Sequence, residues 1–252
     1  MRIASLGSGS KGNGTVVEGA AGRLLVDLGF GIKETIRRLA RLGLTPLDID
    51  ALVVTHEHAD HINGVAPFAR KFRTPVYMTA GTYEPERLGV IPVRKTVRDG
   101  QSFSVGSLTV LPVVVPHDAR EPCQYIFREH NCQIGVLTDL GHVTPHVRQH
   151  FSDCDILLLE CNYDAQMLAT GPYPPALKRR VGGDLGHLSN DQAMQLLQGI
   201  DLLRLRHLVV SHVSEKNNSP ELARSALTPV LEGWTGQLTL ATQLEGFDWL
   251  SA

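Results

Sequence analysis

The feature that most constrains this chain is a cluster of metal-binding side chains directly after a short apolar run. Residues 51–55 have the sequence ALVVT, which is typical of a buried β-strand. Three histidines and one aspartate follow within six positions: His56, His58, Asp60 and His61. Zinc and similar ions prefer imidazole and carboxylate ligands, and burying these groups without a partner is costly. The segment therefore predicts a metal site at the end of a strand, in preference to a histidine cluster satisfied within a loop.

Short apolar runs recur along the whole chain and predict its architecture. Strands are expected at residues 2–6, 15–18, 23–27, 51–55, 75–79, 108–115, 133–138, 156–160, 207–211, 238–242 and 247–250. Helices are expected at residues 32–42, at 190–199 after a Ser189 cap, and at 220–231 after a Ser219 cap. The Pro-, Gly- and Arg-containing segment 171–186 is expected to form an ordered loop or a short helix. These elements predict one α/β domain over residues 1–252, with two packed sheets and helices outside.

Four further polar residues end predicted strands, as metal ligands of α/β proteins often do. They are Asp27 after RLLV, His117 after LTVLPVVVP, Asp139 after QIGVLT and His212 after HLVVS. A single histidine after a strand is more often a surface or capping residue. Four such residues in a chain that also carries the HEHADH segment favour one shared site.

Composition excludes few functions, but it bears on the possible binding partners and on the cellular compartment. The 24 basic and 26 acidic side chains give a net charge of -2, so a nucleic-acid enzyme would need a local basic surface. The four cysteines lack Cys-x-x-Cys spacing, and we expect them to be small buried residues in a reducing environment. The N-terminus has no signal-like apolar stretch, and no run approaches the roughly 18 apolar residues of a membrane helix. A cytoplasmic protein without membrane contact is therefore expected, and nothing indicates its oligomeric state.

The order of these residues resembles the metallo-β-lactamase superfamily. The His-x-His-x-Asp-His segment, then a lone histidine, an aspartate and a last histidine after strands, fit that family over nearly the whole chain. The resemblance implies an α/β fold of the αββα sandwich type with two divalent metal ions, zinc or manganese, or iron. It implies that His56, His58 and His117 bind one ion, that Asp60, His61 and His212 bind the other, and that Asp139 bridges both. Asp27 matches the aspartate that orients the ligand loop without binding metal.

Finer features are similar to the YycJ/WalJ group of this superfamily. They are SLGSGSKGNGT, THEHADHINGV, TDLGHV, NYD, GPYPPALKRRVGGDLGHLSN and SHVSEKNNSPELA. His58 stands where the flavodiiron branch has glutamate, and the ligand set lacks the cysteine of zinc β-lactamases. The group is similar to tRNase Z and RNase J in its core. The resemblance implies a phosphodiester hydrolase, a 5′-3′ exonuclease with double-stranded DNA favoured over RNA.

In this reading two ions about 3.5–4 Å apart share a water and lower its pKa toward about 7, and the bridging hydroxide attacks phosphorus. Asp60 is then both a ligand and an acceptor for that hydroxide. His187, in a glycine-flanked turn before a helix, is the candidate proton donor for the leaving oxygen, or else a loop histidine. Glu160, at the end of ILLLE, either orients a histidine or caps a helix.

Substrate contacts are predicted from weaker signals. His142 lies three residues past Asp139, and the loop at residues 8–14 offers Ser10, Asn13 and backbone N–H groups to a phosphate. The basic run is Lys178, Arg179 and Arg180, and it is either a duplex-binding patch or an ordinary solvated surface.

Two other functions remain open from the residues. One is a small-molecule hydrolase of the same fold that cleaves a thioester, a lactone or a cyclic phosphodiester. The other is a non-catalytic metal-binding protein, which seven intact ligands disfavour because a purely structural site needs no open coordination position. Fold alone decides neither.

Overall fold

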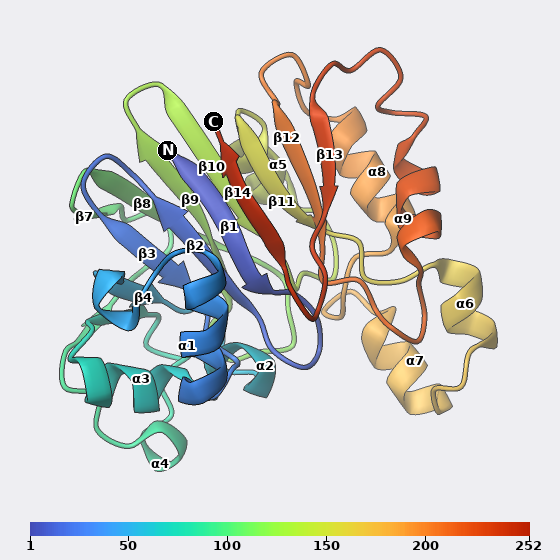
Figure 1. Ribbon diagram of the computed structural model, residues 1–252. Helices are drawn as coiled ribbons and strands as arrows, with labels where there is room; N and C mark the ends of the chain where they lie inside the picture. The colour runs from blue at the N-terminus through green and yellow to red at the C-terminus, as the bar shows by residue number, and fades with distance from the viewer.

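The computed structural model describes residues 1–252. The N-terminal half of the chain supplies most of one seven-stranded sheet. Its strands, in spatial order, are β14 (Phe247–Ser251), β1 (Arg2–Gly7), β2 (Gly14–Glu18), β3 (Arg23–Val26), β4 (Ala51–Val53), β5 (Val76–Met78) and β6 (Arg94–Thr96). Neighbouring strands are antiparallel from β14 to β3 and parallel from β3 to β6. Because β14 pairs with β1, the two chain termini lie close together (Figure 1).

A second seven-stranded sheet has the same plan. Its strands, in spatial order, are β13 (Gln237–Leu240), β12 (His207–Ser211), β11 (Ile156–Glu160), β10 (Cys132–Leu137), β9 (Cys123–Glu129), β8 (Leu108–Val114) and β7 (Phe103–Val105). The strands are antiparallel from β7 to β10 and parallel from β10 to β13. Each sheet therefore has a parallel half, and polar residues at the ends of parallel strands fall on one edge of a sheet.

Helices cover the outer face of each sheet (Figure 1). The first sheet carries α1 (Ile32–Arg41), α2 (Ala59–Ile62), α3 (Val65–Phe72), α4 (Pro85–Leu88) and the 3₁₀ turn η1 (Pro46–Asp48). The second carries α5 (Pro145–Phe151), α8 (Asn190–Gln198) and α9 (Pro220–Leu227). Two further helices, α6 (Ala165–Thr170) and α7 (Pro175–Val181), stand apart from the sheets at one end of the molecule. No helix combines the length and the apolar character that crossing a membrane requires.

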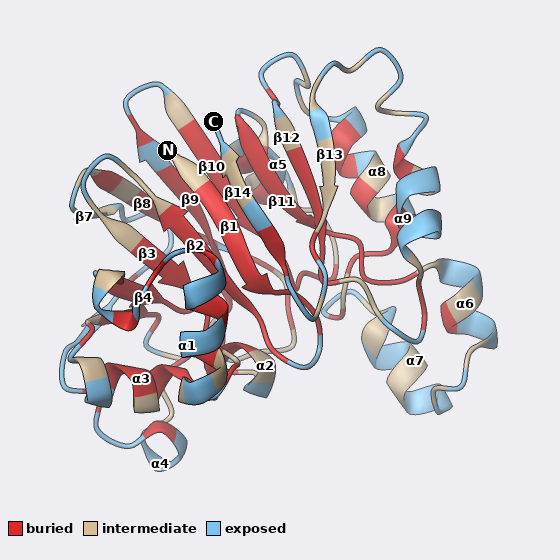
Figure 2. Ribbon diagram, viewed as in Figure 1, coloured by how far each residue is buried: buried red, intermediate tan, exposed pale blue.

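The alternation of strand side chains creates three apolar layers. In β1, Ile3 packs between the two sheets, whereas Ala4 and Leu6 pack under the helices of the first sheet. In β11, Leu158 faces the other sheet and Leu159 faces the helices of the second sheet. The central strands are covered by the other sheet on one face and by helices on the other, so they are buried on both faces (Figure 2). This explains why their sequences are continuous apolar runs.

The structure confirms the predicted sandwich and adjusts several elements. Strand β9 and helix α3 were not anticipated, because Gln124 and Arg128 interrupt one apolar run and Arg70 and Lys71 interrupt the other. The last helix ends at Leu227 instead of residue 231. Segment 171–186 contains a short helix, α7, as one of the two predicted alternatives. All four cysteines are free thiols, and they are buried except Cys132, which is partly exposed.

Candidate metal centre

Polar side chains converge where the two sheets present the ends of their parallel strands. Asp27 directly follows β3, Asp139 lies two residues beyond β10, and His212 directly follows β12. All three adopt a left-handed backbone, with φ of 57°, 49° and 52°. Residues other than glycine rarely adopt this conformation, which costs energy that the surrounding structure must offset. The same unusual turn at three strand ends redirects each side chain toward one point.

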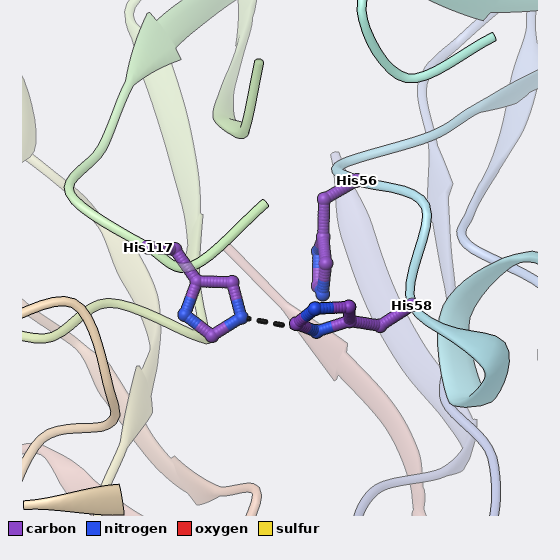
Figure 3. Close-up of side chains that lie close together, drawn as sticks. All are labelled: His56, His58 and His117. Carbon is purple, nitrogen blue, oxygen red and sulfur yellow. Dashed lines mark hydrogen bonds between the residues drawn. The ribbon is translucent and has the colours of Figure 1, made fainter. Parts of the chain in front are cut away.

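The first cluster consists of His56, His58 and His117, whose ligand atoms lie within 4.8 Å of one another. Nε2 of His117 lies 3.2 Å from Nδ1 of His58 (Figure 3). The other ring nitrogens donate to carbonyl oxygens, His117 Nδ1 to Gly186 at 2.9 Å and His58 Nε2 to Asp118 at 3.3 Å. Two lone pairs therefore face each other, and a cation between them would relieve their repulsion.

His56, the third histidine of this cluster, also has a ring nitrogen that lacks a hydrogen-bond partner. Nε2 of His56 is buried and has no hydrogen-bond partner, while its Nδ1 lies 2.9 Å from the hydroxyl oxygen of Thr55. A buried polar atom without a partner is rare in folded proteins. The donor set therefore fits a divalent cation.

The second cluster consists of Asp60, His61 and His212. Oδ2 of Asp60 lies 3.3 Å from Nε2 of His61 and 3.5 Å from Nε2 of His212. Nδ1 of His61 donates to Asp27 at 2.8 Å, which leaves the lone pair of this ring on Nε2, the nitrogen that faces Asp60. Asp27 also accepts hydrogen bonds from the backbone N–H and the hydroxyl of Thr55, each at 2.8 Å. The structure thus places Asp27 where it holds both the His61 ring and the start of the HEHADH segment.

Asp139 lies between the two clusters. It forms a third group of possible ligands with His56, from the first cluster, and His61, from the second. Its Oδ2 is buried without a hydrogen-bond partner and lies 3.3 Å from Nε2 of His61. All seven predicted ligands are therefore brought together, in overlapping groups that share the aspartate expected to bridge.

Glu160 and His187 extend the site on one side. The fully buried Glu160 accepts a hydrogen bond of 2.7 Å from Nδ1 of His187, and its Oε1 lies 3.3 Å from Nδ1 of His212. Its Oε2 accepts from the backbone N–H groups of Leu140 and Leu188, each at 3.1 Å. Glu160 thus contacts two histidines, as one of the two alternatives expected, but it does not cap α8, whose N-cap is Ser189.

Neighbouring carboxylates and histidines in this region shift one another's pKa values against the effect of burial. Burial alone would raise the pKa of Glu160, but the adjacent His187 holds it well below its usual range. Burial would likewise lower the pKa of His187, but the Glu160 carboxylate raises it above its usual value. Against the effect of burial, the Asp139 carboxylate raises the pKa of His212 to about 10. The carboxylates of Glu160 and Asp139 are therefore held in their charged form, and this negative charge would suit a bound cation.

The clusters open into a cavity of about 350 Å³. Its lining residues are Ser10, His58, Ala59, Asp60, Asp139, Asn162, Tyr173, Arg180, Val181, His187, His212, Val213 and Ser214. Of the predicted substrate contacts, Ser10 and Arg180 belong to this wall, and Arg180 forms an ion pair with Asp118.

The other predicted substrate contacts lie elsewhere. Asn13 is buried, and its Nδ2 lies 3.2 Å from Oδ2 of Asp60 and 3.0 Å from Nε2 of His61, so it supports the ligands. His142 lies outside the cavity wall and donates from Nδ1 to the carbonyl of Asp184. Lys178 bonds back to the carbonyl of Ala169, and Arg179 also lies outside the wall.

Sequence reasoning missed several residues around the site. Asn162 lies two positions beyond Glu160 and donates to the carbonyl of His212, so the same strand-end signal would have identified it. Asp118 follows His117 directly and carries the ion pair to Arg180. Gln243 donates from Nε2 to the carbonyl of Gly12 and accepts from the N–H of Lys11, and no sequence signal points to it.

Comparison with known proteins places the chain in a family. Residues 22–213 match the family model described as "Beta-lactamase superfamily domain". The exodeoxyribonuclease YycJ of Bacillus anthracis is 34% identical over 92% of this chain and 89% of its own length. The exodeoxyribonuclease WalJ of Streptococcus pneumoniae is 33% identical over 90% of this chain and 87% of its own length.

Among solved structures, the metallo-β-lactamase fold protein YhfI of Bacillus subtilis superposes with a TM-score of 0.76. The alignment covers 99% of both chains at 16% identity, which supports the fold alone. Together with two sheets, outer helices and a His/Asp cluster capable of binding metal, these matches agree with the family predicted from the HEHADH segment. The chain belongs to the beta-lactamase superfamily and, within it, to the family of the YycJ and WalJ proteins.

Proposed function

We propose that this protein is a dinuclear metal-dependent phosphodiesterase that removes nucleotides from the 5′ end of DNA. The observation that carries the proposal is the pair of ligand clusters joined by Asp139, beside a histidine that lines the same open cavity. Relatives that match nine-tenths of the chain are named exodeoxyribonucleases, which supports DNA as the substrate.

In this proposal His56, His58 and His117 would hold one divalent cation, and Asp60, His61 and His212 would hold the other. Asp139, which groups with residues of both clusters, would help to hold both. Zinc, manganese and iron all suit this mixture of imidazole and carboxylate ligands. When bound, such a pair supplies Lewis-acid activation of water and stabilises charge on the phosphate.

His187 is the proton donor for the leaving oxygen in this proposal. Because Nδ1 is occupied by Glu160, Nε2 is the nitrogen available to a substrate in the cavity. The Glu160 carboxylate raises the pKa of His187 above its usual value, which favours the ring that carries a proton on Nε2 as well as on Nδ1. Asp60 contributes a carboxylate oxygen at the cavity wall that accepts a hydrogen bond from the attacking water.

The walls of the cavity favour a phosphodiester over the alternative substrates. Most lining side chains are polar, and Arg180 places a guanidinium there, which pairs well with phosphate oxygens. A thioester or lactone hydrolase needs a more enclosed apolar pocket. Arg180 must exchange its Asp118 partner for substrate, which an exposed ion pair of small net energy permits.

The test uses the full chain with Mn²⁺ or Zn²⁺ and a panel of end-labelled single- and double-stranded DNA and RNA. We expect mononucleotide release from the 5′ end of duplex DNA and loss of activity in His58→Ala. His142→Ala, a histidine outside the cavity, is the matched control and should retain the wild-type rate. Cleavage of a bis-aryl phosphate without cleavage of any polymer would instead favour the small-molecule hydrolase.

A further inference from the structure

Tyr173 is the tyrosine of this chain that lines the metal cavity. The other tyrosines have internal contacts: Tyr77 stacks on Phe103, and Tyr83 and Tyr125 donate hydrogen bonds to carbonyl oxygens. Tyr163 is buried with an exposed fraction of 8%. Tyr173 is only partly buried, and its side chain makes neither a ring contact nor a hydrogen bond within the protein. Its aromatic face is therefore available to a ligand.

The backbone around Tyr173 is stiff. Pro172 precedes it and Pro174 and Pro175 follow it, in the connection between α6 and α7. Proline fixes its own φ, and a residue before proline is restricted to extended conformations. The start of the connection is also tied down, because the N–H of Gly171 donates to the carbonyl of Met167 at 2.7 Å. The backbone that carries this ring therefore needs little additional ordering when a ligand binds.

The neighbours of Tyr173 in the cavity wall indicate the chemistry of that ligand. Arg180 and His187 offer hydrogen-bond donors suited to phosphate, while Tyr173 offers a flat π-system. A nucleotide combines these two requirements, because its phosphate is charged and its base is planar. Aromatic side chains stack on bases with little sequence preference, because every base has a π-face. The volume of about 350 Å³ lies at the low end of ligand pockets, which favours one nucleotide over a longer segment.

We propose that Tyr173 forms a nucleobase subsite that stacks on the base of the terminal nucleotide during its removal. This inference rests on the proposed exonuclease function and adds a specificity-determining residue to it. Stacking against this ring holds the terminal nucleotide so that the phosphodiester on its 3′ side reaches the metal clusters. The subsite recognises the presence of a base and not its identity.

The experiment compares two duplex DNA substrates of identical sequence. In one the 5′-terminal nucleotide carries its base, and in the other that position is an abasic tetrahydrofuran. For wild-type protein we expect kcat/KM to be about tenfold higher with the base present, as base–aromatic stacking predicts. Tyr173→Ala should bring this ratio close to one, and Tyr173→Phe, which keeps the ring, should retain it. The ratio cancels any general loss of folded or metal-loaded protein.

The outcomes separate this proposal from the one on which it rests. If wild-type protein cleaves both substrates but Tyr173→Ala keeps the wild-type ratio, the subsite is wrong while the exonuclease function stands. Equal cleavage of both substrates by wild-type protein also overturns the subsite. If wild-type protein cleaves neither substrate with Mn²⁺ or Zn²⁺, the exonuclease proposal itself fails and the subsite fails with it. Tyr173→Leu, which keeps bulk without a π-face, should behave like Tyr173→Ala.

Discussion

Glu160 and His187 are joined by a hydrogen bond of 2.7 Å between a fully buried carboxylate and a histidine at the cavity wall. Glu160 is itself held by the backbone N–H groups of Leu140 and Leu188, so the carboxylate has a fixed position. The His187 ring consequently has one orientation and one nitrogen free for substrate. This is the arrangement that a proton donor requires.

His187→Ala should therefore reduce turnover in a way that depends on the leaving group. With a DNA substrate, whose alkoxide needs a proton, we expect kcat to fall by about 10²–10⁴-fold. With a p-nitrophenyl phosphodiester, whose phenolate leaves without a proton, kcat should fall far less. Steady-state kinetics on both substrates measure the difference. An equal loss on both would assign His187 a structural role.

Asp27→Asn tests how His61 is held. The substitution keeps the shape of the side chain and tolerates the left-handed backbone, but it removes the charge that faces His61. Metal affinity should weaken by about 10–100-fold, as for other partners of ligating histidines. Competition with a chromophoric chelator measures the affinity. Asp153→Asn, at an exposed position, is the control, and an unchanged affinity in Asp27→Asn would remove its assigned role.

Removal of divalent metal should abolish activity and lower thermal stability. Buried side-chain atoms of His56, Asp139 and His212 have no hydrogen-bond partner within the protein, and a cation would bind them only in the folded state. Metal at about 100 times its Kd should add roughly 2.7 kcal/mol to the free energy of unfolding. Thermal unfolding of chelator-treated protein, before and after addition of Mn²⁺ or Zn²⁺, measures the shift. No change in Tm with any divalent ion would contradict the assigned clusters.

Gln243→Ala should loosen the glycine-rich loop that supports the metal centre. The Gln243 side chain bonds to the backbone of Lys11 and Gly12, and the same loop carries Asn13 beside Asp60. Loss of two hydrogen bonds should lower the free energy of unfolding by about 1–3 kcal/mol and also reduce kcat/KM. Urea denaturation and steady-state kinetics provide the two readouts. Gln101→Ala, an exposed glutamine without side-chain bonds, should change neither.

Much of the candidate metal centre could be predicted from the sequence because its residues obey local rules. HEHADH places four predicted ligands within six residues shortly after β4. Asp27, Asp139 and His212 lie at or just beyond the ends of parallel strands. Such strand ends meet at one edge of a sheet, so position along the chain predicts position in space. The two packed sheets were predicted from the short apolar runs that mark the strands.

Only the tertiary structure decided which other residues reach the site. Lys178, Arg179 and Arg180 are consecutive, but successive side chains of a helix point about 100° apart, so one lines the cavity and two do not. Asn13 was predicted to contact substrate and lies instead beside Asp60, since the loop packs against α2. Gln243 reaches Gly12 across 231 positions through the pairing of β14 with β1. Local sequence determines strand ends and ligand spacing, whereas contacts between distant segments depend on how the layers pack.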